Sequence, residues 1–204
     1  MSIDEIPPTQ KGRHYELRAK GLREFAGLRR DDERLNPFDL AHAAGLFVAP
    51  YDQIEPLLTD ATKEHLIGGG KEAWSGGAAS QVLPNGLKLI ILNPTHGRSR
   101  QHATLMEEVC HLFFGHKPTK LAIKRRDRNG NVVARDYHEE IEEEAYSTGA
   151  AALVPYTVLK RMITEGRTSR EIARHFDVSR PLVEYRMKVS RLWDLYKQCV
   201  FSGS

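Results

Sequence analysis

The sequence is poor in cysteine, in long apolar runs and in net charge, and each shortage excludes a class of protein. Its 204 residues include two cysteines, Cys110 and Cys199, which lie far apart in the chain. Two such cysteines provide no disulfide framework, so we expect a reducing compartment. No stretch approaches the roughly 20 consecutive apolar residues that a membrane-spanning helix needs. The formal net charge of +3 is too small to indicate nucleic-acid binding by itself.

The N-terminal segment up to Lys20 has no apolar core between its charged residues, so we do not expect a signal peptide. Hydrophobic residues make up 40% of the chain and charged residues 28%, which is ordinary for a globular protein. These features predict a soluble, cytoplasmic protein that has no membrane partner.

The chain is long enough for one compact domain with a small module attached. We expect a flexible polar tail over residues 1–12, a main domain over 13–165 and a helical module over 166–204. The spacing of apolar residues predicts helices at about 14–30, 37–45, 99–114, 138–153 and 155–165, and two short helices within 168–192.

Strands are expected at 46–49, 78–82 and 87–92, and the turn signal Asn85-Gly86 joins the last two as a hairpin. A second, strongly basic hairpin is expected within 119–137. The glycine-rich stretch 66–80 lacks the Gly-Lys-Ser/Thr ending of a phosphate loop, so we expect a loop there and no nucleotide site. The predicted fold is α+β, with a small, mostly antiparallel sheet packed against several helices.

The helix expected at 99–114 is apolar over most of its circumference, and its polar wedge includes Glu107, Glu108 and His111. Glu107 and His111 are four residues apart, so both side chains can reach one point. By itself this pattern is also that of a core helix with a solvated stripe. However, carboxylates and a histidine on a largely buried helix are costly unless they coordinate something. An acidic helix that begins about 30 residues later could deliver a third metal ligand.

Several stretches in this region resemble the ImmA/IrrE metallopeptidase family. In that family a strand ending in Asn-Pro leads to a Thr-Leu-x-His-Glu-x-x-His helix that closes with Gly-His. A Glu-Ala-Asn … Ala-Ala-x-Leu-Leu-x-Pro helix follows. The matching stretches here are Leu89–Pro94, Arg100–His116 and Glu144–Pro155, and the earlier stretches Pro37–Ala41 and Gly45–Val48 also fit. The resemblance covers roughly residues 36–192 and implies a gluzincin-like peptidase core.

The resemblance implies a role for three residues. Glu108 matches the catalytic glutamate, His111 the second metal-binding histidine and Glu144 the acidic third ligand. A helical wheel places Glu144 at the border of the face formed by Ala145 and Thr148, whereas Glu143 points away from it.

Glu107 stands where the family has its first histidine. Glutamate is an acceptable zinc ligand, but a Glu107, His111 and Glu144 set would bring two carboxylates to one ion and acidify water less than two histidines do. Oxygen-rich ligation makes Mn²⁺ or Fe²⁺ possible beside Zn²⁺. Three alternatives stay open: metal binding of altered strength, recruitment of another ligand such as His138, His102 or Cys110, or a fold that has lost catalysis.

If a metal binds, Glu108 would act as the general base for the attacking water. Tyr137 or Tyr146 could donate to the oxyanion, although a tyrosine on an acidic helix is often only a packing residue.

The C-terminal stretch from Ser169 to Val183 has the spacing of a helix-turn-helix, with Asp177 at the turn position that usually holds glycine. Arg180 and Arg186 on its second helix are the candidate contacts to DNA or to a partner. ImmA/IrrE proteins carry a similar segment after the peptidase helices, so the resemblance implies a structural or docking role. The mixed charge of the module argues against DNA contact.

We therefore expect a zinc-type metallo-endopeptidase. By the resemblance, its protein substrate would be a transcriptional repressor that is cleaved in a stress, phage-defence or mobile-element response. The alternative is a catalytically inactive, peptidase-like regulator that binds a protein partner or DNA.

Overall fold

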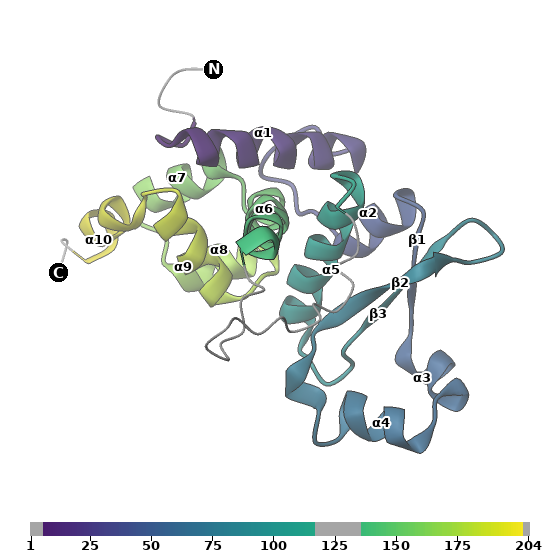
Figure 1. Ribbon diagram of the computed structural model, residues 1–204. Coiled ribbons are helices and arrows are strands. Elements are labelled where there is room, and N and C mark those ends of the chain that lie inside the picture. The colour runs from purple at the N-terminus through teal and green to yellow at the C-terminus, as the bar shows by residue number, and fades with distance from the viewer. Residues whose placement is uncertain (1–5, 117–135, 202–204) are drawn as a thin grey trace, which may run out of the picture.

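The computed structural model describes residues 6–116 and 136–201 (Figure 1). The side chains of residues 65, 73, 79–81 and 136–138 are outside this description, as is nearly all of the second hairpin expected at 119–137. The helices are α1 (Gln10–Phe25), α2 (Pro37–Ala43), α3 (Tyr51–Ile54), α4 (Asp60–Ile67), α5 (Arg98–Phe113), α6 (Asp136–Leu153), α7 (Tyr156–Thr164), α8 (Ser169–Phe176), α9 (Arg180–Val189) and α10 (Trp193–Phe201). The strands are β1 (Leu46–Ala49), β2 (Gly76–Val82) and β3 (Lys88–Leu92). The fold is α+β, as predicted.

The three strands form one mixed sheet in the order β1-β3-β2. β2 and β3 are antiparallel, and Gly86 has φ +82°, as the predicted Asn85-Gly86 turn requires. β1 is parallel to β3, with Leu46 opposite Lys88. The expectation of a mostly antiparallel sheet is therefore corrected. The chain leaves β1 through α3 and α4 and returns as β2, so β1 takes the free edge of β3 in the same direction.

Helix α5 is the central element, because it packs against α2, α6 and the sheet (Figure 1). Its apolar side chains Leu105, Met106, Val109 and Cys110 are fully buried. Helix α6 comes very close to α5, since a Cβ added at Gly149 would lie only 3.2 Å from the Cβ of Met106. This close approach brings the acidic start of α6 beside the polar wedge of α5.

Helix α1 lies across α6 and is anchored at its far end by Arg23. This arginine is 3% exposed, and it donates hydrogen bonds to the carbonyls of Ala152, Arg30, Asp31 and Glu33. α1 begins at Gln10, earlier than predicted, because the Thr9 side chain accepts a hydrogen bond from Gly12 N and caps the helix.

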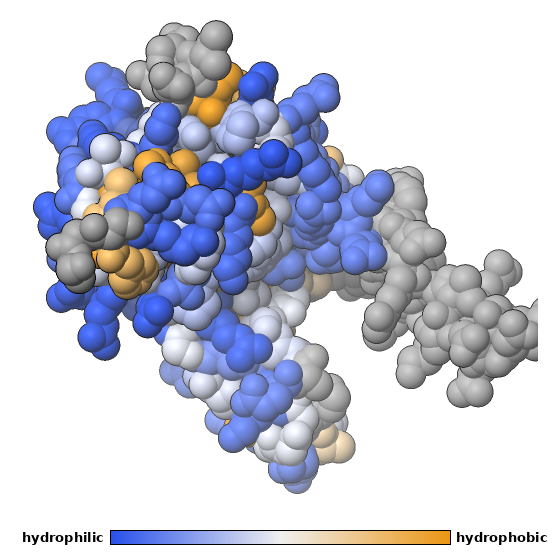
Figure 2. All heavy atoms as spheres, turned by 90° about the vertical axis from the view of Figure 1, so that its left-hand side faces the viewer, coloured by the Kyte–Doolittle hydropathy of each residue, from blue (hydrophilic) through white to orange (hydrophobic). Residues whose placement is uncertain are grey.

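The C-terminal helices share one hydrophobic core with the rest of the chain. This core includes buried residues from Ala19 to Tyr196. Asp177 has φ 56° between α8 and α9, the left-handed conformation expected at that position. The face that carries α7–α10 is largely hydrophilic, with only small apolar patches (Figure 2). Among the described residues, no helix is both long and apolar enough to cross a membrane.

Candidate metal centre

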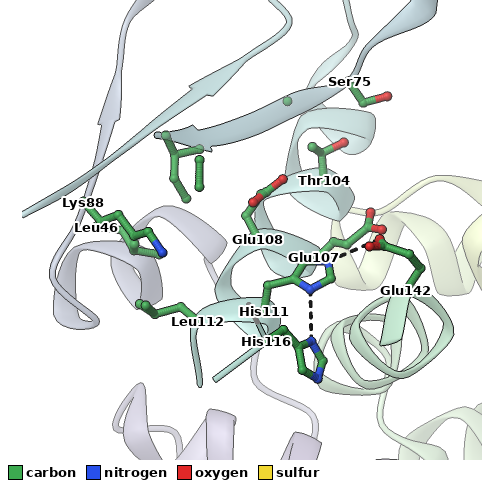
Figure 3. A pocket seen from close by; sticks show the side chains of 13 residues that line it. Leu46, Ser75, Lys88, Thr104, Glu107, Glu108, His111, Leu112, His116 and Glu142 are labelled. Atoms are coloured by element: carbon green, nitrogen blue, oxygen red, sulfur yellow. Dashed lines mark hydrogen bonds and ion pairs between the residues drawn. The ribbon is translucent and has the colours of Figure 1, made fainter. Parts of the chain in front are cut away.

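A cleft of about 460 Å³ lies between α5, the sheet and the start of α6 (Figure 3). The polar wedge of α5 forms one wall, with Thr104, Glu107, Glu108 and His111. The sheet and the segment before β2 provide the opposite wall, and α6 contributes one acidic side chain. Residues from these other elements that line the cleft are Leu46, Ser75, Gly76, Ala78, Lys88, Ile90 and Glu142. The predicted polar wedge is thus found on the wall of a cavity.

Glu107, His111 and Glu142 form a cluster in which one potential ligand atom from each residue lies within 4.8 Å of the others. The Nε2 atom of His111 is 3.3 Å from a carboxylate oxygen of Glu142. Glu107 and His111 point the same way because they are one helical turn apart on α5. Glu142 reaches them from α6, and this residue was not singled out from the sequence.

The electrostatics of the cluster are those of an uncompensated acidic site. Burial, the charges of Glu142 and Glu108, and a hydrogen bond with Glu142 raise the pKa of Glu107 to about 7. Burial lowers the pKa of His111, and His116 adds to this, while Glu142 opposes it. A neutral imidazole beside crowded carboxylates is the donor set that a divalent cation stabilises, so these residues fit a metal ion.

Glu108 also faces the cleft, next to the cluster but not part of it (Figure 3). Burial raises the pKa of Glu108, the charge of Glu142 raises it further, and Lys88 opposes both. A carboxylate with a raised pKa is better matched to accepting a proton near neutral pH than an exposed one.

His116 contacts the Nδ1 atom of His111, on the side away from the cluster, and Glu144 contacts His116 in turn. The Nδ1 atoms of His111 and His116 are 3.0 Å apart, and Nε2 of His116 is 3.2 Å from Glu144. Arg18 of α1 pairs with Glu144 at 2.7 Å, and His14 lies 3.3 Å from it. This chain of contacts leaves Nε2 of His111 facing the cleft, an arrangement typical of histidines that bind metals.

The structure thus brings together two of the three metal ligands expected from the sequence, Glu107 and His111. Glu144 lies on the α1 side of α6, and among the described residues His116 connects it to the cluster. Tyr146 is half-buried and packs against Tyr185 at 5.0 Å between ring centroids. Tyr137 lies in α6, but its side chain is outside the described residues.

The other alternative ligands are placed away from the cluster or not described. His102 is buried beside Arg98 and Phe38, and Cys110 is fully buried, where burial raises the pKa of its thiol strongly. The side chain of His138 is outside the described residues. Glu142 could have been found from the sequence, since it precedes the buried Ala145 by three residues and therefore shares its side of α6.

The two arginines proposed as DNA or partner contacts have different environments. Arg180 is exposed and pairs with Glu184 at 2.6 Å. Arg186 is 3% exposed; it donates to the carbonyl of Val154 and pairs with Glu16 of α1. Arg186 therefore holds α9 against α1 and the end of α6.

An α+β fold with a cleft between a small sheet and a helix that carries acidic residues and a histidine defines a metallopeptidase-like protein. The chain belongs to the Peptidase_M78 family, because the family model described as the IrrE N-terminal-like domain matches residues 73–188, more than half of its length. The matched segment contains β2, β3 and α5–α9, including Glu107, Glu108, His111, Glu142 and Glu144. The predicted resemblance to the ImmA/IrrE family is thereby confirmed. No curated protein matches the chain in sequence.

Proposed function

We propose that the protein is a metal-dependent endopeptidase whose divalent cation is held by Glu107, His111 and Glu142. The observation that carries the proposal is the cluster of these three side chains in a cleft, with Glu108 beside it. Glu144, which the family resemblance favours as third ligand, is the alternative to Glu142. In the proposed arrangement it instead orients His111 through His116.

Zn²⁺ is the proposed ion, with Mn²⁺ or Fe²⁺ as alternatives. Two carboxylates and one imidazole form a harder, more negative ligand set than the family's usual pair of histidines. Such a set weakens the selectivity for zinc and neutralises more of the charge of the ion. We therefore expect a measurable affinity for Mn²⁺, which a site with two histidines and one carboxylate would bind less well relative to Zn²⁺.

When bound, the cation supplies Lewis acidity toward the scissile carbonyl and toward a water molecule. Glu108 takes a proton from the attacking water and passes it to the departing amine. Lys88 and Glu142 influence this step because both interact electrostatically with the Glu108 carboxylate. Tyr146 or Tyr137 is proposed to donate a hydrogen bond to the oxyanion; the Tyr146 ring packs against Tyr185.

The substrate is proposed to be a protein chain in extended conformation. Among the described strands, β2 pairs only with β3, and its residues Gly76 and Ala78 line the cleft. Unpaired backbone groups of an edge strand can bind a peptide as an added strand. In line with the family resemblance, we propose that this peptide belongs to a transcriptional repressor, cleaved in a stress, phage-defence or mobile-element response.

The second candidate function is that of a catalytically inactive regulator. It is favoured by Glu107 in place of a histidine and by the α8–turn–α9 unit, which has the order of a helix-turn-helix. For binding to DNA, Arg180 is the exposed candidate, whereas the Arg186 side chain is engaged in the core. If α9 contacts DNA, the Arg180→Ala variant should bind more weakly at low salt.

The deciding experiment is metal analysis by mass spectrometry of the purified protein and of His111→Ala, Glu142→Ala and Glu144→Ala. We expect near-stoichiometric metal in the wild type, its loss in His111→Ala and Glu142→Ala, and its retention at lower affinity in Glu144→Ala. Loss in Glu144→Ala with retention in Glu142→Ala would instead assign Glu144 as the ligand. No metal after reconstitution with Zn²⁺ and Mn²⁺ would favour the inactive regulator.

Catalysis is tested with Glu108→Gln, which should keep the metal. New protein N-termini generated by the wild type in a cell extract are mapped by mass spectrometry. We expect Glu108→Gln to form them on the order of 10²–10⁴ times more slowly. Equal cleavage by both proteins would refute the assigned role of Glu108.

A further inference from the structure

The cleft extends beyond the metal cluster into a second half with a different chemistry. Figure 3 shows Leu46, Lys88 and Leu112 on one side of Glu108 and His111, with Glu142 on the opposite side. Leu46 and Ile90 line this half of the cleft and are 3% and 0% exposed. This half is therefore an apolar recess with a lysine on its wall, while the other half is acidic.

Lys88 is held in place by the sheet. It lies at the start of β3 opposite Leu46 of β1, and its backbone N donates to the carbonyl of Gly45. Its side chain is half-buried, and none of the ion pairs within the described part of the chain involves it. Its charge acts on Glu108, although the two groups are not paired. A half-buried ammonium group has lost part of its hydration, and this one has no carboxylate partner among the residues that the structure describes. A carboxylate of a bound ligand can supply that partner.

We infer that Leu46, Lys88 and Leu112 form a specificity subsite that accepts an acidic side chain, preferably glutamate, next to the scissile bond. This inference rests on the proposed function. The methylene groups of glutamate would lie against Leu46 and Leu112, and its carboxylate would pair with the Lys88 ammonium group. A lysine or arginine at the same substrate position would be rejected, because it would place two like charges in a partly desolvated recess.

The competing explanation is that Lys88 serves only to lower the pKa of Glu108. The two roles predict different results. A residue that only tunes Glu108 shifts the pH profile of cleavage equally for all substrates. A subsite residue changes the ranking of ligands that differ only in charge.

The test uses the metal-loaded protein and hydroxamates, which bind a catalytic metal and carry one side chain next to the hydroxamate group. Two series place that side chain on either flank, with glutamate, glutamine, leucine and lysine compared in each. We expect the glutamate compound of one series to bind the wild type on the order of tenfold more tightly than the glutamine compound, and the lysine compound most weakly. Lys88→Gln should abolish the difference between glutamate and glutamine, and Lys88→Glu should invert the order of glutamate and lysine.

Lys71→Gln, a change at an exposed lysine outside the cleft, is the control and should leave the order unchanged. Equal binding of all side chains in the wild type, or an order that does not respond to Lys88→Glu, would overturn the subsite while leaving the metal site intact. Failure of every hydroxamate to bind a protein shown to contain metal would overturn the proposed catalytic cleft and the subsite with it.

Discussion

Replacing Glu107 by glutamine should make the metal-free protein more stable at alkaline pH. In the absence of a cation, Glu107 shares the cleft with the charges of Glu142 and Glu108, and its pKa is raised to about 7. Glutamine has nearly the shape of the protonated carboxyl group and can donate its amide N–H to Glu142. The change therefore fixes at every pH the state that the wild type reaches only by binding a proton.

The sign follows from proton linkage. The pKa of Glu107 is about 7 in the folded protein and near its ordinary value of 4.5 in the unfolded chain. Protonated Glu107 therefore makes its full contribution to the free energy of unfolding below pH 4.5. This contribution is lost as the pH rises through 7. This difference in pKa corresponds to about 3 kcal/mol, because each unit of pKa is worth about 1.4 kcal/mol. For a chain of this size, that would change Tm by roughly 6–12 °C.

The assay is urea or thermal unfolding in EDTA, followed by circular dichroism at pH 5 and pH 8. The free energy of unfolding of Glu107→Gln should exceed that of the wild type by up to about 3 kcal/mol at pH 8 and by much less at pH 5. Glu140→Gln, at an exposed position of α6, is the control and should show no such pH dependence. Added Zn²⁺ should restore the advantage to the wild type. An equal gain at both pH values, or a loss at pH 8, would refute this account of the cluster.

Two further predictions concern the packing that positions the centre. Gly149→Val should force α5 and α6 apart at Met106, lowering stability by about 1–3 kcal/mol in unfolding experiments. It should also weaken metal binding in a titration, and an unchanged metal affinity would show that helix spacing does not set the site. Arg186→Met should cost about 3 kcal/mol because the Glu16 carboxylate loses its charged partner and keeps the hydrogen bond from the Tyr156 backbone N–H, and the double change with Glu16→Leu should recover part of the loss. No recovery would mean that packing of the arginine stem matters more than the charge pair.

Much of the local structure could be predicted because it depends on neighbouring residues. The Asn85-Gly86 turn, the strand at 46–49 and the amphipathic helix around His111 all follow from local patterns of turn residues and apolar spacing. Helices α3, α4 and α10 were not predicted. The parallel pairing of β1 with β3 was also missed, because apolar periodicity reports burial and carries no information on which strand lies beside which.

The candidate site shows the same division between local and distant information. Glu107 and His111 could be paired from their spacing alone. On α6, Glu142 and Glu144 both border the buried side that contains Ala145, one on each edge. Which edge faces α5 depends on where α1 lies. α1 lies along the edge of Glu144, where its Arg18 pairs with the Glu144 carboxylate. A helical wheel cannot determine this, because the decisive contact comes from a distant part of the chain.

The contact between α1 and α6 also has a consequence for synthesis of the protein on the ribosome. α1 is made before α6, and α6, which covers its apolar side, ends at Leu153, well over 100 residues later. At typical rates of translation, Ala19 and Leu22 would wait on the order of ten seconds for their partner. During that interval the nascent chain would expose an amphipathic helix to chaperones, and the cluster of Glu107, His111 and Glu142 would form only after α6 has been made.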